Sequence, residues 1–303
     1  MGAVTAALSV GLDIGATKTL GLVLDADGGI LAEVREPTKP GADGIVGSAA
    51  RVFDALRDAT GQSLAGTVGV GIPGLVDVER GSVKHAVNLG VDGDWLPLRD
   101  LLAARLGVPV VLENDVNAAT LGAAALSGAD DLVYLSIGTG LAAGLVLDGR
   151  LRRGEHGAAG EIGHVPVDPQ GNVCQCGQRG CLETIASGSA LAAAWPSGNV
   201  PPAQALFEAA RSGDPSAVVV RDRFTRGVAS AIRVLSLAVD PASIVLGGGV
   251  AQLGEPLRDA VAQALLEQAA SSPFLASLDL AGRLSVVPSD YPVAAVGAAF
   301  LGR

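Results

Sequence analysis

The sequence predicts a soluble α/β protein with two domains that share one repeated plan. The chain has 303 residues, of which 49% are apolar and 17% charged, enough to bury two cores of ordinary size. Strand-like and helix-like patterns alternate along it, which is typical of α/β domains with a mixed sheet. A fourteen-residue unit also occurs twice, as LDIGATKTLGLVLD at 12–25 and LSIGTGLAAGLVLD at 135–148, with eight identical positions.

The first half of the chain reads as a strand meander followed by alternating helices and strands. Glycine turns separate three short apolar runs, which predicts strands at 10–12, 21–24 and 30–34. Helical spacing or Ala-rich composition without proline predicts helices over 45–59, 98–106 and 116–126. Two more apolar runs predict strands at 68–72, where Pro73 and Gly74 form a turn, and at 108–112.

The second half begins with an irregular segment. Residues 154–188 hold all three cysteines and two of the three histidines, and their many glycines exclude one regular element. Asp214 and Pro215 predict the start of a long helix, with Asp as N-cap and Pro at the first helical position, that continues to about residue 239. Strands at 243–246 and 283–287 and a helix of small residues at 293–301 complete the pattern.

Charge and hydropathy exclude several classes of partner. The formal net charge is −10 and no run of Lys or Arg occurs, so we expect no binding to nucleic acid or to an anionic membrane. No stretch of roughly 18 apolar residues is free of glycine and charge, so we expect no transmembrane span. The first residues lack a signal peptide, and Ala6 replaces the Ser or Thr of a myristoylation motif. These features predict a cytoplasmic protein that binds small molecules or other proteins.

The two repeated hairpins have the composition of phosphate-binding turns. Glycines let backbone N–H groups approach an anion without obstruction by a Cβ atom. The first copy adds a possible Mg²⁺ ligand and phosphate-binding groups: Asp13, Gly15, Thr17 and Lys18. The second offers only Gly138, Thr139 and Gly140, because Ser136, Gly140 and Leu141 stand at the positions of Asp13, Thr17 and Lys18. Either hairpin alone could be a plain β-turn, but the duplication favours one nucleoside triphosphate held near its γ- and β-phosphates.

The cysteines indicate a metal site. An odd number of cysteines in an acidic cytoplasmic protein argues against a disulfide framework. The spacing Cys174-x-Cys176-x4-Cys181, with His164 ten residues before the first cysteine, supplies the four ligands of a closed tetrahedral Zn²⁺ site. The alternative is a group of buried thiols without a metal.

Six short motifs follow one another over nearly the whole chain: DIGATK at 13–18, GIPG at 71–74, ENDVNAA at 113–119, IGTG at 137–140, GEIGH at 160–164 and CQCGQRGCLE at 174–183. In this order they resemble the motifs of the ROK family of repressors, open reading frames and sugar kinases. The resemblance implies the actin-like, ribonuclease H-like fold, in which two α/β domains close over a central cleft. We expect a small domain at 1–117 joined by the closing helix 292–303, and a large domain at 118–291 with a zinc loop at 160–183.

The resemblance also implies residue roles. Phosphoryl transfer to a sugar needs a base for the hydroxyl proton, and the family pattern assigns Asp115 to the 6-hydroxyl and Asn114 to neighbouring hydroxyls. Asp115 as a simple helix N-cap is the alternative. The sugar site is completed by Gly74, Glu161, His164 and Glu183. The family pattern assigns zinc to His164, Cys174, Cys176 and Cys181, with the second ring nitrogen of His164 facing the sugar, and nucleotide contacts to Gly247, Gly248 and Gly249.

The expected activity is that of an ATP- and Mg²⁺-dependent hexokinase with a structural Zn²⁺, most simply a glucokinase. Its acceptor could instead be N-acetylglucosamine, N-acetylmannosamine, mannose or fructose. A sugar-sensing regulator without a DNA-binding domain is the second class, although the first strand begins by about residue 8 and leaves no room for a helix-turn-helix. Polyphosphate is a less favoured donor, because related polyphosphate kinases generally lack the cysteine cluster. Ala142 stands where many family kinases have a glycine in the second hairpin.

Family members are commonly homodimers or homotetramers, and on that ground we expect a homodimer.

Overall fold

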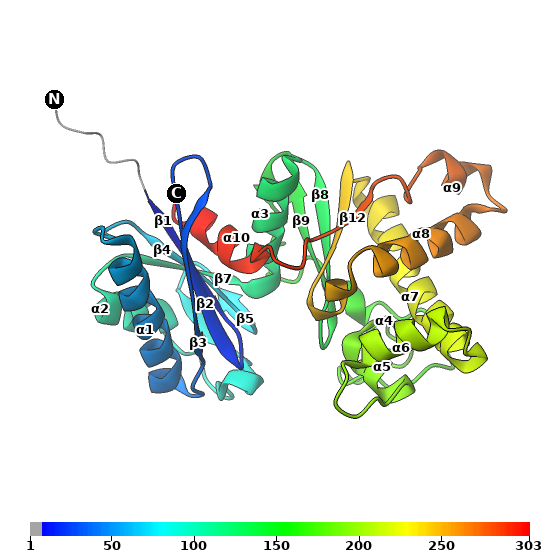
Figure 1. The fold of residues 1–303 in the computed structure, drawn as a ribbon, viewed down its shortest axis with the longest axis horizontal. Helices are drawn as coiled ribbons and strands as arrows, with labels where there is room; N and C mark the ends of the chain where they lie inside the picture. Colours follow the sequence, from blue (N-terminus) through cyan, green and yellow to red (C-terminus); the bar gives the residue numbers. More distant parts are fainter. Residues whose placement is uncertain (1–7) are drawn as a thin grey trace. The chain divides into compact units, whose positions relative to one another are not determined.

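The computed structural model describes residues 8–303, which form two compact α/β units (Figure 1). The first unit holds the chain up to Gly128, residues 154–157 and residues 292–303. The second holds residues 129–153 and 158–291. None of the helices within 8–303 has the length and apolar character needed to span a bilayer. The expectations about signal and lipidation motifs concern the first six residues and lie outside the described part.

A five-stranded mixed sheet forms the centre of the first unit, in the order β3-β2-β1-β4-β7. Its strands are β1 (Ser9–Ile14), β2 (Lys18–Leu24), β3 (Ile30–Pro37), β4 (Val68–Ile72) and β7 (Val110–Asn114). The first three form an antiparallel meander, and β1, β4 and β7 run parallel. A small hairpin, β5 (Leu75–Asp77) and β6 (Ser82–Lys84), and the 3-10 turn Val87–Leu89 follow β4. Since the carboxyl ends of parallel strands meet at one edge, this order brings the ends of β1 and β7 near each other.

Helices cover both faces of this sheet. They are α1 (Ala42–Thr60), α2 (Leu98–Leu106), α3 (Asp115–Ser127) and α10 (Val293–Leu301). Apolar side chains of α1 and α2 pack on one face, and α10 packs on β1, β4 and α3. A Cβ atom at Gly69 would collide with the carbonyl oxygen of Ala298, and one at Gly122 would collide with that of Val293. The small residues of α10 and its partners therefore allow a close backbone approach.

The packing of α3 moves the boundary between the units. The sequence placed it after residue 117, whereas the first unit of the structure extends to Gly128. The reason is the contact of α3 with α10, which ties the whole of α3 to the first sheet. The helix 293–301 itself groups with the first unit.

The second unit repeats the sheet order of the first, as β10-β9-β8-β11-β12. Its strands are β8 (Leu132–Ile137), β9 (Leu141–Leu147), β10 (Arg150–Leu151), β11 (Ser243–Gly247) and β12 (Leu284–Val286). Strands β8 to β10 form the antiparallel part, and β8, β11 and β12 run parallel. The repeat seen in the sequence is therefore a repeat of topology.

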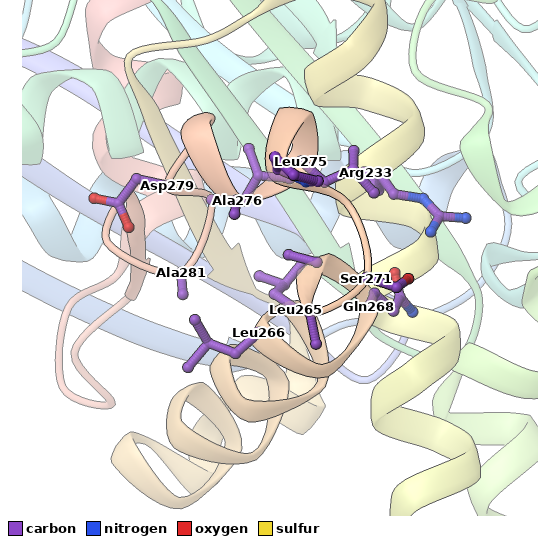
Figure 2. Close-up of a pocket in the computed structure, with 13 residues that line it drawn as sticks. Arg233, Leu265, Leu266, Gln268, Ser271, Leu275, Ala276, Asp279 and Ala281 are labelled. Carbon is purple, nitrogen blue, oxygen red and sulfur yellow. The ribbon is translucent and has the colours of Figure 1, made fainter.

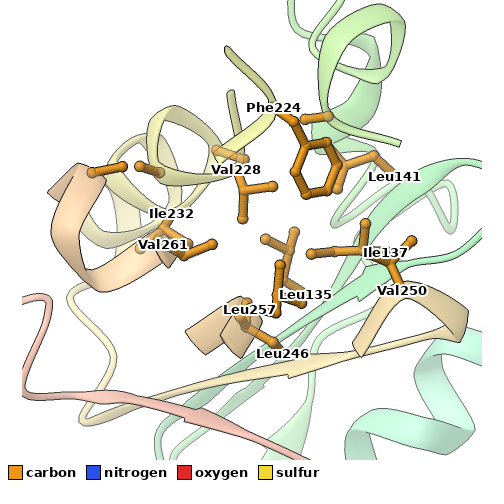
Figure 3. Packing of buried hydrophobic residues seen from close by; sticks show 14 of the residues in the cluster. Leu135, Ile137, Leu141, Phe224, Val228, Ile232, Leu246, Val250, Leu257 and Val261 are labelled. Carbon is orange, nitrogen blue, oxygen red and sulfur yellow. The ribbon is translucent and has the colours of Figure 1, made fainter. Parts of the chain in front are cut away.

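Most helices of the second unit share one apolar cluster with this sheet. They are α4 (Glu183–Ala186), α5 (Gly188–Ala194), α6 (Pro202–Arg211), α7 (Pro215–Val239), α8 (Glu255–Ala269) and α9 (Pro273–Ser277), with 3-10 turns at Ile162–His164 and Gly249–Leu253. Figure 3 shows Phe224 and Val228 of α7 and Val261 of α8 in the same cluster as Leu135 of β8. Asp214 caps α7 as predicted, and its Oδ1 accepts from the backbone N–H of Ser216 at 2.8 Å.

The two hairpins differ in register by one residue. Ile14 pairs with Thr19 across the first turn, whereas Ile137 pairs with Leu141 across the second. The second turn is thus one residue shorter, and Leu141 is not the structural counterpart of Lys18, as the gapless comparison assumed. A shift of one residue exchanges the faces of a strand. Accordingly, Leu145 of β9 lies in the core with Leu135, while in the first copy it is Val23 that joins the corresponding core.

Candidate active site

Two carboxylates lie close together at the carboxyl edge of the first sheet. Asp13 comes from the end of β1, and Asp115 is the first residue of α3, directly after β7. Burial, and next the negative charge of Asp115, raises the pKa of Asp13 from 3.8 to about 7, while the charge of Lys18 opposes the rise. Burial also raises the pKa of Asp115, although its hydrogen bond from the N–H of Val116 limits the rise. Near neutral pH the pair therefore holds a proton more readily than ordinary aspartates do.

Asn114 caps helix α3 and fixes the start of that helix next to Asp115. Its Oδ1 accepts from the N–H of Val116 at 2.9 Å and from that of Asn117 at 3.3 Å. Its Nδ2 donates to the carbonyl of Gly74 at 3.1 Å. The alternative reading of Asp115 as the N-cap is therefore wrong, because Asn114 takes that place. The bond from Asn114 also holds the Pro73-Gly74 turn beside the two carboxylates.

Glu113 is a site residue that the sequence reading missed. Its residue exposure is 1%, and its Oε1 accepts from the N–H of Asn114 at 2.9 Å and from Nδ2 of Asn117 at 3.0 Å. A buried carboxylate among apolar neighbours needs such donors. Its signal in the sequence was a Glu at the end of the apolar strand 108–112. We assign Glu113 a positioning role, because it holds the residue before Asp115.

The first hairpin presents a cation beside the carboxylates. The N–H of Gly15 donates to the carbonyl of Lys18 at 2.9 Å and closes the turn, and Thr17 and Lys18 are exposed. The carbonyl of Thr17 accepts from the N–H of Thr38 at 3.1 Å, which fixes the turn to the end of β3. No ion pair to Lys18 occurs within residues 8–303, so its ammonium is available to an anionic ligand.

The second hairpin is held from behind through its carbonyl groups. The N–H of Gly188 donates to the carbonyl of Gly138 at 2.8 Å, and Oγ of Ser189 donates to that of Thr139 at 2.7 Å. In the described part of the chain, the N–H groups of Thr139 and Gly140 have no partner. The turn therefore directs its bonded carbonyls toward α5 and keeps two donors for a ligand. Ser189 was not predicted, because the pattern of a hairpin does not reveal which segment packs behind it.

Glu183 connects the zinc loop to this hairpin. Its Oε2 accepts from the N–H of Leu141 at 3.0 Å, and its Oε1 lies 4.0 Å from Sγ of Cys174. A Cβ atom at Gly140 would stand 2.5 Å from Oε2 of Glu183, so this close approach requires glycine. Gly248 lies beside Ile137 at the start of this hairpin. Its φ is 80°, and a Cβ atom added there would stand only 2.6 Å from the backbone of Ile137.

The predicted metal ligands form one cluster. The ligand atoms of His164, Cys174, Cys176 and Cys181 all lie within 4.8 Å of one another. The Sγ atoms of Cys176 and Cys181 are 3.7 Å apart, and Sγ of Cys174 is 3.8 Å from Nδ1 of His164. Four ligands about 2.3 Å from a tetrahedral Zn²⁺ are separated by about 3.8 Å. The residues therefore fit zinc, with Nδ1 as the ligand atom of His164.

The other ring nitrogen of His164 faces a second predicted sugar-binding residue. Nε2 lies 3.8 Å from Oε2 of Glu161, and the side chain of Glu161 is 56% exposed. Metal binding at Nδ1 would fix the tautomer and leave Nε2 to interact with a ligand or with Glu161. Glu161, His164 and Glu183 thus lie around the zinc loop of the second unit. Asp13, Lys18, Gly74, Asn114 and Asp115 gather in the first unit.

The ROK family model matches residues 9–299, almost the whole described chain. The chain belongs to the ROK family. The glucokinase of Thermotoga maritima is 34% identical to it, over 92% of this chain and 96% of that relative. Among solved structures, the ROK hexokinase of Thermus thermophilus is similar with a TM-score of 0.81 and 33% identity, and 97% of each chain is covered. A ROK family glucokinase from Streptomyces griseus, solved in complex with glucose and AMPPNP, has a TM-score of 0.79 and 33% identity, over 98% and 99% of the chains.

These comparisons confirm the family that the six motifs indicated and the fold that it implies. Each unit of this ROK protein contains the mixed five-stranded sheet of the actin-like, ribonuclease H-like fold. The loop that brings the three cysteines and His164 together belongs to the second unit.

The raised pKa of Asp13 predicts a pH-dependent effect of Asp13→Asn on stability. The pKa is 3.8 in the unfolded reference and about 7 in the folded chain, so the free energy of unfolding falls as pH rises through this window. An asparagine at position 13 does not ionise, so the variant does not undergo this fall in the free energy of unfolding. In magnesium-free buffer, the variant should therefore gain several degrees in Tm over the wild type near pH 8, and little near pH 4. The exposed Asp58→Asn is the control, and a Tm difference independent of pH would contradict the prediction.

Proposed function

We propose that this ROK protein is an ATP-dependent hexokinase that transfers the γ-phosphoryl group to the 6-hydroxyl of a hexose, with glucose as the first candidate. The observation that carries the proposal is the half-buried pair Asp13 and Asp115 beside Lys18, which has no ion-pair partner within residues 8–303. Together the three side chains supply a base, a cation-binding carboxylate and a phosphate-binding ammonium, which are the groups that phosphoryl transfer needs. Relatives that match this chain over nearly their whole length are glucokinases.

Asp115 would act as the general base. A base is most effective when its pKa lies near the working pH, and burial raises the pKa of Asp115 in that direction. Asn114 and Glu113 fix the backbone before it, so the carboxylate is held without side-chain rearrangement. Asp115 would accept the proton of the sugar hydroxyl as the oxygen attacks phosphorus, and the bond from phosphorus to the leaving oxygen breaks. Lys18 and the N–H groups of the second hairpin would bind the phosphate oxygens.

The residues present also fit the two metals. Repulsion between Asp13 and Asp115 would be relieved by a cation, so Asp13 suits Mg²⁺, which prefers oxygen ligands and neutralises phosphate charge. Zinc in the Cys3His cluster would hold the His164 ring through Nδ1. Glu161, Nε2 of His164 and Glu183 are then the groups that we assign to sugar hydroxyls.

The sugar is identified by a substrate panel. Glucose, mannose, fructose, N-acetylglucosamine and N-acetylmannosamine would each be compared by kcat/KM with ATP, and with polyphosphate as alternative donor. We expect the highest value for glucose with ATP. If a sugar binds but none of the five sugars causes consumption of ATP, the protein is a sugar-sensing regulator and the kinase assignment is wrong. Sedimentation of the same preparation tests the expected homodimer.

The two hairpins should differ in the kinetic parameter that they affect. The position of a Cβ at Gly138 has no atom within 4 Å, so Gly138→Ala leaves the ligand-free fold unchanged and blocks only a bound phosphate. This variant and Thr139→Ala should raise the KM for ATP with little change in kcat. Asp13→Ala should instead lower kcat. Steady-state kinetics at saturating hexose distinguish the two results, and equal effects on KM alone would contradict the assignment.

A further inference from the structure

A pocket of about 390 Å³ lies in the second unit, between α7, α8 and α9 (Figure 2). Its volume is in the range of small-molecule sites. None of the residues assigned to phosphoryl transfer, sugar binding or zinc lines it. Most of the wall is aliphatic, with Leu265 and Leu266 from α8, Leu275 and Ala276 from α9, and Ala281. The pocket is therefore separate in its residues from the candidate active site.

One side of the pocket carries polar groups that lack partners. In Figure 2 the guanidinium of Arg233 lies on the same side as the ends of Gln268 and Ser271. Arg233 is half-buried, and within residues 8–303 it has neither a hydrogen bond nor an ion pair. A guanidinium binds a carboxylate through two parallel hydrogen bonds. This side of the pocket thus presents an unused site for an anion.

We infer that the pocket binds a small amphipathic carboxylic acid with an aromatic or branched apolar body. The carboxylate pairs with Arg233, and the apolar body packs on the leucines. Inorganic phosphate does not meet these requirements, because it leaves the aliphatic wall uncovered. The inference does not depend on the proposed kinase activity.

Two related probes test the inference on the full chain by calorimetry and thermal shift. N-acetyl-L-phenylalanine has the carboxylate and the apolar ring, and its primary amide lacks the charge. We expect the acid to bind and the amide to bind at least about tenfold more weakly, as loss of a charge-assisted bond implies. Failure of the acid to bind at millimolar concentration would overturn the inference.

Arg233→Met separates the proposed contact from general apolar binding. It should weaken binding of the acid about tenfold or more, and leave the affinity of the amide unchanged. Arg211→Met, on the exposed end of α6, is the matched control and should change neither affinity. Unchanged affinity of the acid in Arg233→Met overturns the inference. A second result would also overturn the inference: Arg233→Met sediments differently from the wild type, and no probe binds. In that case a second copy of the chain would cover the pocket.

Discussion

Asp115→Asn should fold normally and lose roughly 10²-fold to 10⁴-fold in kcat, the usual effect of removing a positioned general base. The asparagine side chain has the same shape, and its Oδ1 can still accept from the N–H of Val116, so the start of α3 is preserved. It cannot take the proton of the sugar hydroxyl. Phosphorylation of glucose with ATP, measured at saturating concentrations of both, gives the loss in kcat directly.

Two comparisons keep this result interpretable. Asp58→Asn changes an exposed aspartate of α1 in the same unit, and should retain wild-type turnover. Circular dichroism and Tm should show that Asp115→Asn remains folded. The wild type should also lose kcat/KM as pH falls through the raised pKa of the Asp13 and Asp115 pair, because the base must be unprotonated to act. Near-normal turnover of a folded Asp115→Asn protein would rule out the assignment.

Loss of zinc is the second large effect that we expect. Cys181→Ser removes a fully buried ligand and should abolish stoichiometric zinc, lower Tm and raise the KM for the hexose. The sugar is affected because His164 and Glu183 are held by the same loop, and Glu183 in turn binds the N–H of Leu141. Elemental analysis of the native protein should find about one zinc per chain.

A chelation experiment distinguishes a structural metal from a catalytic one. After treatment with a chelator, Mg²⁺ alone should not restore the KM for the hexose or Tm, whereas added Zn²⁺ should restore both. The wild type without chelator serves as the reference for Tm. Native protein that contains no zinc, or chelated protein with unchanged Tm and sugar affinity, would contradict the structural role.

Most of the helices and strands that were predicted follow from local rules. Strand 68–72, helix 98–106 and helix 293–301 have the predicted limits, because apolar period and turn residues act over a few positions. The N-cap of α7 was predicted from two residues, Asp214 and Pro215. The candidate zinc ligands were likewise chosen from spacing and residue type, and they do converge in space.

Contacts between distant segments account for the differences. The boundary at residue 117 was displaced because α3 packs on α10, which lies far along the chain. Ser189 was missed because its partner Thr139 lies far away in the sequence. Glu113 was missed for another reason, because a Glu at the end of an apolar strand does not show that its side chain will be buried. Asn114, rather than Asp115, proved to be the cap because the exact start of a helix depends on a difference of one residue in backbone conformation.

By itself, the sequence determined the repeated α/β plan, the family and the chemical inventory of the candidate site. Those properties depend on residue type and short spacing. Only the tertiary structure decided that the second hairpin is one residue shorter, so that Lys18 has no equivalent at Leu141. Only the fold places Asp13, half-buried, beside Asp115 and raises its pKa to about 7. Strand register and burial depend on the packing of distant segments, which no local pattern contains.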